Sequence, residues 1–412
     1  GGGWQTIMIS ALDEHVTLSD PVAGYSSFLT RIHHHSDLGD SEQTPVDLGV
    51  TADYTHLTAM LAPRPALLTF NRNDNCCFAS PHALPPLLDA AKPIYRLYGK
   101  EESLRWHVNE EPGTHNFGRD NRQALYRMFG DFFFADDPDF NAVEISCENE
   151  LKTVDELTVA LPGDNGDFHT LALKLSESLP RDQADSSAGQ GRSRRKLQAS
   201  LRDILKLDGP LDVKSGKAGE AITVDGLTAT PWKIQAGKEW TLPAVEITPE
   251  KYRATTVLLG DSGRRGLAAE VQTLLQHGHR VIACDPFYLG ESKIASRDFL
   301  FALCVSTVGS RPLGIQAAQI NAMARWAGTT SGNRPVHVQA HGPRTSLMVL
   351  CAAAVDGGGM NHIHLVDGMK TLKTILTSDI SVNQQPELFC FGLLEKFDIP
   401  LLKPMAGARF SE

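Results

Sequence analysis

The chain has few of the features that mark membrane or nucleic-acid-binding proteins. No apolar run among its 412 residues reaches membrane-spanning length, so we expect no membrane span. Its 39 lysines and arginines are outnumbered by 49 aspartates and glutamates, which gives a formal net charge of −10. Because phosphate contacts need clustered cations, we also expect no nucleic-acid partner. The 42% apolar content predicts a globular protein with sizeable cores.

Cysteine and histidine lack the spacing of a metal site. The seven cysteines show no metal-like pattern, and their odd number does not fix the redox compartment. We interpret the adjacent Cys76 and Cys77 as packing residues, with a vicinal disulfide as the less favoured alternative. The run His33-His34-His35 would point to alternate faces of an extended chain and cannot converge on one ion. We therefore expect no metal and no organic cofactor.

The stretch from Arg64 to Phe117 organises the chain. An apolar run over residues 64–70 ends in a polar turn that holds Asp74, as expected of a buried parallel strand that delivers a carboxylate at its C-terminal edge. About forty residues later, His115 lies in another turn. The elements expected between them are a helix over 81–91 and strands over 93–98 and 104–108.

An acid followed by a histidine, each in a turn that leaves a strand, matches the Asp…His part of the chain order Ser…Asp…His. Asp74 and His115 are therefore the candidate acid and base. His56 and His107 are weaker candidates for the base, because neither lies in a turn after a strand end. The nucleophile is expected upstream of both.

The chain opens with three glycines that run straight into an amphipathic helix. Glycines after a nucleophilic serine let a strand turn tightly into a helix. The opening resembles the nucleophile elbow of acetyl-xylan-esterase-like α/β hydrolases, whose pattern G-x-S-G-G-G-x-Q-T precedes a helix ending in Ala-Leu-Asp. The alternative interpretation of the three glycines is a cloning scar or a flexible start of the chain. The matching residues are Gly1, Gly2, Gly3, Gln5, Thr6, Ala11, Leu12 and Asp13.

The resemblance covers residues 1 to 135 and implies the α/β-hydrolase fold of a serine carboxylesterase. In that pattern the serine would stand immediately before Gly1, so the nucleophile is not in this chain and we expect a fragment. The resemblance further implies Asp74 as the acid, His115 as the base and the Gly1 N–H as a donor to the oxyanion. It suggests a small ester or acetylated carbohydrate as substrate, and relatives of this type are often exported.

A second α/β pattern follows a linker. Residues 180–193 contain no large apolar side chain, which is typical of a linker. Beyond it, an antiparallel opening pair and a βαβαβ alternation predict a second sheet that is mainly parallel. We expect residues 1–140 to form the C-terminal part of a catalytic domain, 141–196 a connecting segment and linker, and 197–412 a second hydrolase-like domain. The expected strands of that domain are 221–234, 240–247, 255–259, 280–285, 335–340 and 362–367.

The second domain is expected to be inert. The frame from Val338 to Gly342 places Ala340 at the nucleophile position, and alanine has no lone pair with which to attack a carbonyl. From the resemblance, we expect the complete protein to be a carboxylic-ester hydrolase. We expect this chain by itself to be inactive, because it lacks the serine. Two alternatives stay open: a non-catalytic binding or scaffold protein with hydrolase-like folds, and a peptidase of the same fold. The acyl group, the alcohol and the oligomeric state are not fixed by the sequence.

Overall fold

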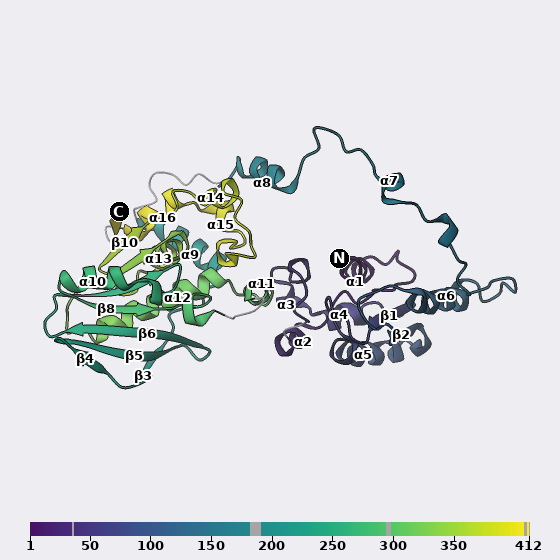
Figure 1. The fold of residues 1–412 in the computed structure, drawn as a ribbon, viewed down its shortest axis with the longest axis horizontal. Helices are drawn as coiled ribbons and strands as arrows, with labels where there is room; N and C mark the ends of the chain where they lie inside the picture. Colours follow the sequence, from purple (N-terminus) through teal and green to yellow (C-terminus); the bar gives the residue numbers. More distant parts are fainter. Residues whose placement is uncertain (35–36, 182–190, 294–297, 408–409, 412) are drawn as a thin grey trace. The chain divides into compact units, whose positions relative to one another are not determined.

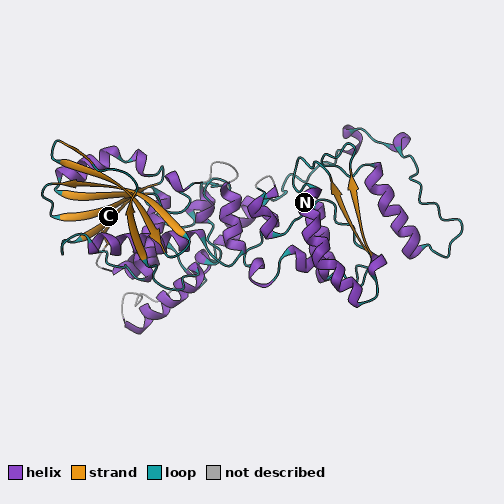
Figure 2. Ribbon diagram, turned by 90° about the horizontal axis from the view of Figure 1, so that it is seen from below, coloured by secondary structure: helices purple, strands orange, loops and turns teal. Residues whose placement is uncertain are grey.

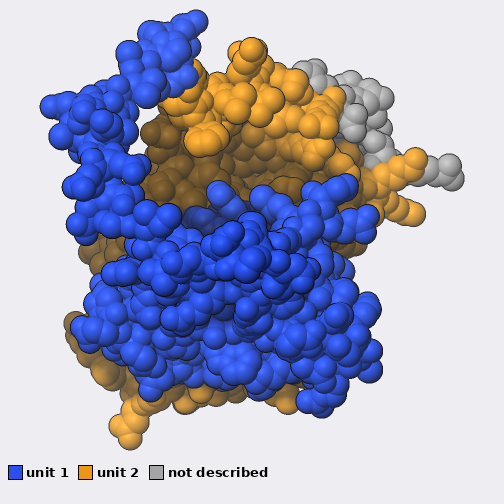
Figure 3. Space-filling model, turned by 90° about the vertical axis from the view of Figure 1, so that its right-hand side faces the viewer, with its two compact units in different colours: residues 1–165, 307–309 blue, residues 166–306, 310–412 orange. Residues whose placement is uncertain are grey.

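The computed structural model divides the chain into two compact units, drawn as a ribbon in Figure 1 and in blue and orange in Figure 3. Unit 1 comprises residues 1–165 and 307–309, and unit 2 comprises 166–306 and 310–412. Both units combine strands with helices, so the expected α/β class is confirmed. The structure describes residues 1–34, 37–181, 191–293, 298–407 and 410–411.

Unit 1 is built on two parallel strands, β1 (Ala66–Asn71) and β2 (Leu104–Asn109). Every residue of β1 is buried, as expected of a strand covered on both faces. Beside it, Ser19 and Val22 make single parallel bridges to β1. The polar turn that holds Asp74 follows β1, as the sequence predicts.

Helices cover this sheet. The strand predicted over residues 93–98 is wrong, because these residues end a long helix, α5, that contains Pro93. Its buried residues recur at helical spacing, and this apolar stripe outweighs the strand preference of Ile94 and Tyr95. The helices of unit 1 are α1 (Gly2–Leu12), α2 (Phe28–His33), α3 (Leu48–Thr51), α4 (Tyr54–Ala59), α5 (Ser80–Leu97), α6 (Arg119–Phe133) and α7 (Val154–Leu157).

The described residues of unit 2 form a nine-stranded sheet in the order β11-β10-β9-β7-β8-β6-β5-β3, with β4 paired to β5. Strands β5 and β6 are the expected antiparallel opening pair, and β7, β8, β9 and β10 are parallel. The bounds are β3 (Val213–Lys217), β4 (Ile222–Val224), β5 (Leu227–Ala236), β6 (Trp240–Pro249), β7 (Ala254–Gly260), β8 (His279–Cys284), β9 (Val336–His341), β10 (His362–Val366) and β11 (Phe410–Ser411).

Helices lie on both faces of this sheet (Figure 2), and side chains of the central strand β7 pack into the core on each face. Val257 and Leu259 belong to the main core with α12 and α13, whereas Leu258 belongs to a second cluster with α10. Successive side chains of a strand point to opposite faces, so one apolar run serves both cores. The helices are α8 (Phe168–Ser176), α9 (Gly191–Leu205), α10 (Ala268–Gln276), α11 (Asp298–Thr307), α12 (Pro312–Thr329), α13 (Pro343–Val355), α14 (Thr374–Thr377), α15 (Leu393–Lys396) and α16 (Ile399–Ala406).

Residues 191–196, which were expected to belong to the connecting segment and linker, lie in α9. Leu201 and Leu205, one helical turn apart, are buried in the core of unit 2, and Arg194 donates to the carbonyl of Met405 at 2.6 Å. The predicted linker falls largely on residues 182–190, outside the described residues. In the described parts of the chain, every helix is too short or too polar to cross a membrane.

Candidate active site

Asp74 is a buried carboxylate in the turn after β1. Its side chain is 0% exposed, and it accepts hydrogen bonds from Asn71 Nδ2 and from the backbone N–H groups of Cys76 and Cys77, each at 3.0 Å. Burial alone would raise the pKa of Asp74. The hydrogen bonds from Asn71, Cys77, His115 and Cys76 outweigh burial and lower this pKa below its usual value, so Asp74 is an anion at neutral pH.

His115 lies against that anion. Its Nδ1 is 2.9 Å from Asp74 Oδ2, and its backbone N–H donates to Asn75 Oδ1 at 3.0 Å. An ionised carboxylate only accepts, so Nδ1 must be the donor. The neutral ring then carries its lone pair on Nε2. Since the His115 side chain is 46% exposed, this geometry suits a base that works at the protein surface.

Four asparagines hold the two turns together, and the sequence analysis did not identify them. Asn71 and Asn109 are the buried last residues of β1 and β2. Asn121 donates to Asn71 Oδ1 at 3.2 Å, and Asn116 donates to Asn109 Oδ1 at 3.0 Å. For Asn71, the available signal was a polar residue at the end of a buried, mainly apolar strand, because a buried amide needs hydrogen-bond partners.

The weaker candidates for the base have other partners. His56 Nδ1 accepts from the backbone N–H of Asp53 at 3.0 Å and so caps α4. His107 lies in the middle of β2, and its Nε2 is 2.8 Å from Asp120 Oδ2. His35 lies outside the described residues, and the described residues contain no cluster of three ligands that could hold a metal.

The start of α1 packs against the segment that pairs with β1. A Cβ atom built on Gly3 would stand 2.2 Å from the carbonyl oxygen of Val22, and one on Gly24 would stand 2.3 Å from the carbonyl carbon of Gly3. Val22 in turn bridges to Thr69 of β1. Two backbones therefore touch where a side chain has no room, which gives Gly3 a structural role. The Gly1 nitrogen is 3.4 Å from Glu42 Oε1.

In unit 2, the turn between β9 and α13 corrects one expectation. Ala340 is not in the turn: it is buried inside β9, opposite Leu259 and Leu365. The strand continues through His341, and Gly342 occupies the turn with a φ of 104°. Because Gly342 has no side chain, it presents no nucleophile in this turn, and the expectation that the second domain is inert stays a prediction.

A carboxylate occupies the helix end at this turn. Asp261 accepts from the backbone N–H groups of Arg344 and Thr345 at 3.0 and 2.8 Å, and from Thr345 Oγ1 at 2.9 Å. Pro343, which follows Gly342, has no N–H to donate. The donors that could stabilise an oxyanion are therefore already used or missing, and the positive end of α13 is neutralised.

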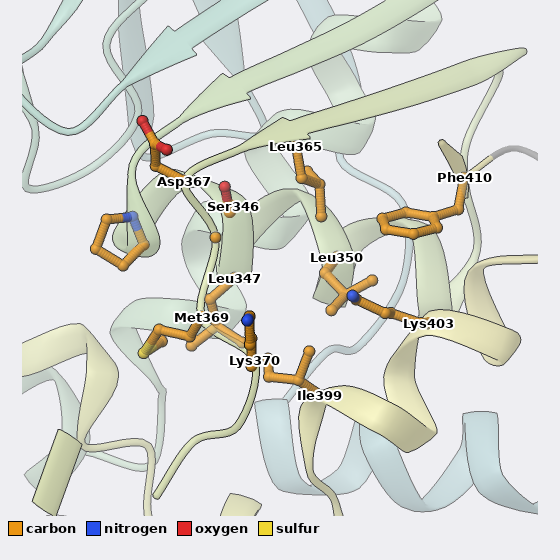
Figure 4. Close-up of a pocket in the computed structure, with 12 residues that line it drawn as sticks. Ser346, Leu347, Leu350, Leu365, Asp367, Met369, Lys370, Ile399, Lys403 and Phe410 are labelled. Atoms are coloured by element: carbon orange, nitrogen blue, oxygen red, sulfur yellow. The ribbon is translucent and has the colours of Figure 1, made fainter. Parts of the chain in front are cut away.

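A cavity of about 320 Å³ lies beside α13, β10 and α16 (Figure 4). Its walls include Leu350, Leu365 and Lys403, and no histidine is among the described residues that line it. The Ser346 hydroxyl, at one end, donates to the carbonyl of Val366 at 3.4 Å. The described residues that line the cavity therefore place no imidazole beside that serine, and the ionisable groups among them are Asp367, Lys370 and Lys403.

No protein-family profile and no curated protein sequence matches the chain. Solved structures of esterases are similar to it. A protein of Bacteroides fragilis provisionally assigned as an acetyl xylan esterase has 12% identity and a TM-score of 0.49, over 61% of this chain and 76% of the other. An acetyl xylan esterase from Paenibacillus sp. R4 has 10% identity and a TM-score of 0.35, over 57% and 76%. Acetyl xylan esterase 1 from Thermoanaerobacterium sp. has 13% identity and a TM-score of 0.31, over 52% and 72%.

Proposed function

We propose that unit 1 carries the acid and base of a serine-dependent carboxylic-ester hydrolase. The observation that supports this role is the pairing of a fully buried carboxylate with a half-exposed imidazole, Asp74 Oδ2 to His115 Nδ1 at 2.9 Å. Because nearly half of the His115 side chain is exposed, the ring is open to an approaching substrate, as a catalytic base requires. The nucleophile belongs, by the resemblance, immediately upstream of Gly1.

In the complete site, His115 Nε2 removes the proton from the serine hydroxyl as the serine attacks the acyl carbonyl. It then returns that proton to the leaving alcohol. Asp74 fixes the Nδ1–H tautomer and stabilises the imidazolium that forms, with Asn71 and two backbone N–H groups holding the carboxylate in place. The N–H of Gly1, as an amide in the longer chain, donates to the oxyanion.

The substrate class is a small ester, with an acetylated carbohydrate as the first choice. This choice rests on the resemblance of the opening Gly1-Gly2-Gly3 stretch to acetyl-xylan-esterase-like hydrolases. Unit 2 acts as a non-catalytic domain. The observation that favours a structural role for it is the Asp261 carboxylate on the N-terminus of α13, where a catalytic elbow would keep its donors free.

The test is a chain extended upstream through a serine and the strands before it. We expect this longer chain to hydrolyse a small acetyl ester such as 4-nitrophenyl acetate, and to lose the activity when a serine-directed phosphonate reacts. Changing His115 to Ala should lower kcat on the order of 10⁶-fold, whereas His56→Ala should leave it unchanged. A longer chain that is indifferent to His115, or active after phosphonate treatment, would contradict the proposal.

A further inference from the structure

Two cysteines lie in contact beside the candidate acid. Cys76 Sγ and Cys77 Sγ are 3.0 Å apart, closer than two unbonded sulfur atoms usually approach, and both are free thiols. Cys76 is exposed and Cys77 is 7% exposed, so one thiol faces solvent and the other lies beneath it. The same two residues supply the backbone N–H groups that hold Asp74 Oδ1.

We propose that Cys76 and Cys77 form an oxidative modification site that closes to a vicinal disulfide and thereby loosens the hydrogen bonds that hold Asp74. The modification needs only the thiol pair. Its effect on catalysis rests on the proposed function, because it acts through the candidate acid.

The geometry of the closed ring gives the reason. A disulfide between neighbours closes an eight-membered ring that contains the peptide bond joining Cys76 to Cys77. Adjacent Cα atoms lie about 3.8 Å apart, less than the usual 4.4 to 6.8 Å across a disulfide, and the sulfur atoms must approach to about 2.05 Å. The backbone inside the ring has to rotate to allow this.

The N–H of Cys77 is part of that ring, whereas the N–H of Cys76 lies outside it. Rotation of the ring therefore turns the Cys77 N–H away from Asp74 Oδ1, which it now meets at 3.0 Å. The Cys76 N–H, also at 3.0 Å, is displaced less. A fully buried carboxylate that loses a donor has no water to replace it, so the carboxylate shifts and carries His115 with it.

The chemistry is thiol–disulfide exchange with a low-molecular-weight disulfide as oxidant. The exposed Cys76 attacks as the thiolate, forms a mixed disulfide and releases one small thiolate. Cys77 then loses its proton and attacks Cys76 Sγ, which closes the ring and releases the second small thiol. Two protein thiols become one disulfide, and one oxidant molecule is reduced to two thiols. Burial raises the pKa of the Cys77 thiol, with the neighbouring Cys76 adding to the effect, so the second step is the slower one.

The first experiment measures the thiols by peptide mapping of the full chain. Trypsin cleavage after Arg72 and Arg96 gives a peptide in which Cys76 and Cys77 are the only cysteines. After treatment with oxidised glutathione and then iodoacetamide, we expect this peptide to be two hydrogen atoms lighter and unlabelled, and dithiothreitol should restore both labels. Cys77→Ser should stop at the mixed disulfide on Cys76. Cys147, an exposed cysteine of the same unit, should behave like that variant and serves as the control.

The second experiment measures the effect on the candidate acid without any ester substrate. Nuclear magnetic resonance of the imidazole nitrogens should show His115 changed on oxidation and restored by dithiothreitol, with His56 unchanged. In Cys77→Ser, the His115 signals should not respond to oxidant. Two alkylated cysteines after oxidation, or a persistent mixed disulfide in the native chain, would overturn the modification site. A closed disulfide with unchanged His115 signals would overturn its coupling to Asp74. None of these outcomes depends on whether the extended chain is an esterase.

Discussion

The two units place a carboxylate differently at the end of a parallel strand. In unit 1, Asp74 is held by donors from its own turn and shares one side with His115, which is half-exposed. In unit 2, the carboxylate oxygens of Asp261 accept hydrogen bonds from the start of α13, and none of the hydrogen bonds described for this carboxylate comes from an imidazole. A carboxylate after a parallel strand can thus hold an imidazole, as Asp74 does, or cap a helix, as Asp261 does.

Other charged side chains in unit 2 also form ion pairs near the ends of its strands. The Glu387 side chain is 0% exposed and forms an ion pair with Arg344, the first residue after Pro343. Arg264 joins Asp285 and Glu291 at the turns after β7 and β8. Each of these charges has a partner of opposite sign, and Glu291 is the half-exposed member of the group. These charged groups of unit 2 therefore connect the turns that follow its strands, whereas the His115 side chain of unit 1 is half-exposed.

The sharpest test of the comparison exchanges the two carboxylates for amides. In the extended chain, Asp74→Asn should lower kcat by about 10⁴-fold, because the amide can no longer fix the imidazole tautomer or stabilise its charged form. Asp261→Asn should leave kcat unchanged and lower the stability of unit 2. Steady-state ester hydrolysis and urea unfolding of both variants give the answer. Equal losses of activity in the two variants would remove the distinction between the units.

The next test asks which charged pair stabilises its unit. Glu387→Ala should cost about 3–5 kcal/mol of unfolding free energy, because it leaves the Arg344 charge without its buried partner. His115→Ala should cost little, since that side chain is half-exposed. Urea unfolding followed by circular dichroism measures both. The matched control is Glu395→Ala, which removes a solvent-exposed pair with Arg181 worth about 0–1 kcal/mol. A Glu387→Ala variant as stable as this control would contradict the structural role.

A smaller effect is expected where α1 begins. Gly3→Ala should destabilise unit 1 by about 1–3 kcal/mol, because its Cβ would meet the carbonyl oxygen of Val22 at 2.2 Å. The control is Gly2→Ala, one residue earlier, where no atom lies within 4 Å and alanine favours a helix. Thermal unfolding should therefore separate two neighbouring glycines of the same helix. Similar melting temperatures for the two variants would show that the contact with Val22 is not needed.

The smallest effect is a difference in pH dependence, and it has opposite signs in the two units. Burial raises the pKa of Asp20 in unit 1 to about 7. The folded state then keeps a proton that the unfolded chain loses near pH 4, so this group stabilises unit 1 at low pH and the contribution is lost as pH rises towards 7. Burial lowers the pKa of His279 in unit 2 to about 4, helped by the nearby His337 and Arg253. Unit 2 therefore loses stability as pH falls from 6.5 towards 4.

Variants isolate these two slopes. The gain in unfolding free energy of Asp20→Asn over the parent chain should be larger at pH 8 than at pH 5. That of His279→Gln should be larger at pH 5 than at pH 8, and each difference should be on the order of 1 kcal/mol. Urea unfolding at the two pH values, on both variants and the parent chain, measures the differences. If the difference in stability between variant and parent changed with pH in the same direction for both variants, the assignments would be contradicted.

Residues close in sequence could be assigned to elements because their periodicity is local. The buried run before Asp74, the antiparallel pair β5 and β6, and the parallel strands after them follow from apolar runs between polar turns. Where two local signals compete, the sequence misleads. Residues 93–98 have strand formers and a proline, yet Tyr95 packs into unit 1 as part of α5 because its stripe of buried residues continues that helix.

The sequence by itself determined the α/β class and predicted that Asp74 and His115 lie in turns after strands, and the carboxyl ends of parallel strands share one edge. Only the tertiary structure decided the polar contacts between segments distant in the chain. Asn121 reaches Asn71 across 50 residues, and Asp261 caps a helix that begins 82 residues later. The exact end of β9, which moves the turn from Ala340 to Gly342, depends on pairing with β7 and β10. A hydrogen bond carries no periodicity, so it becomes visible only when the chain has folded and its partners meet.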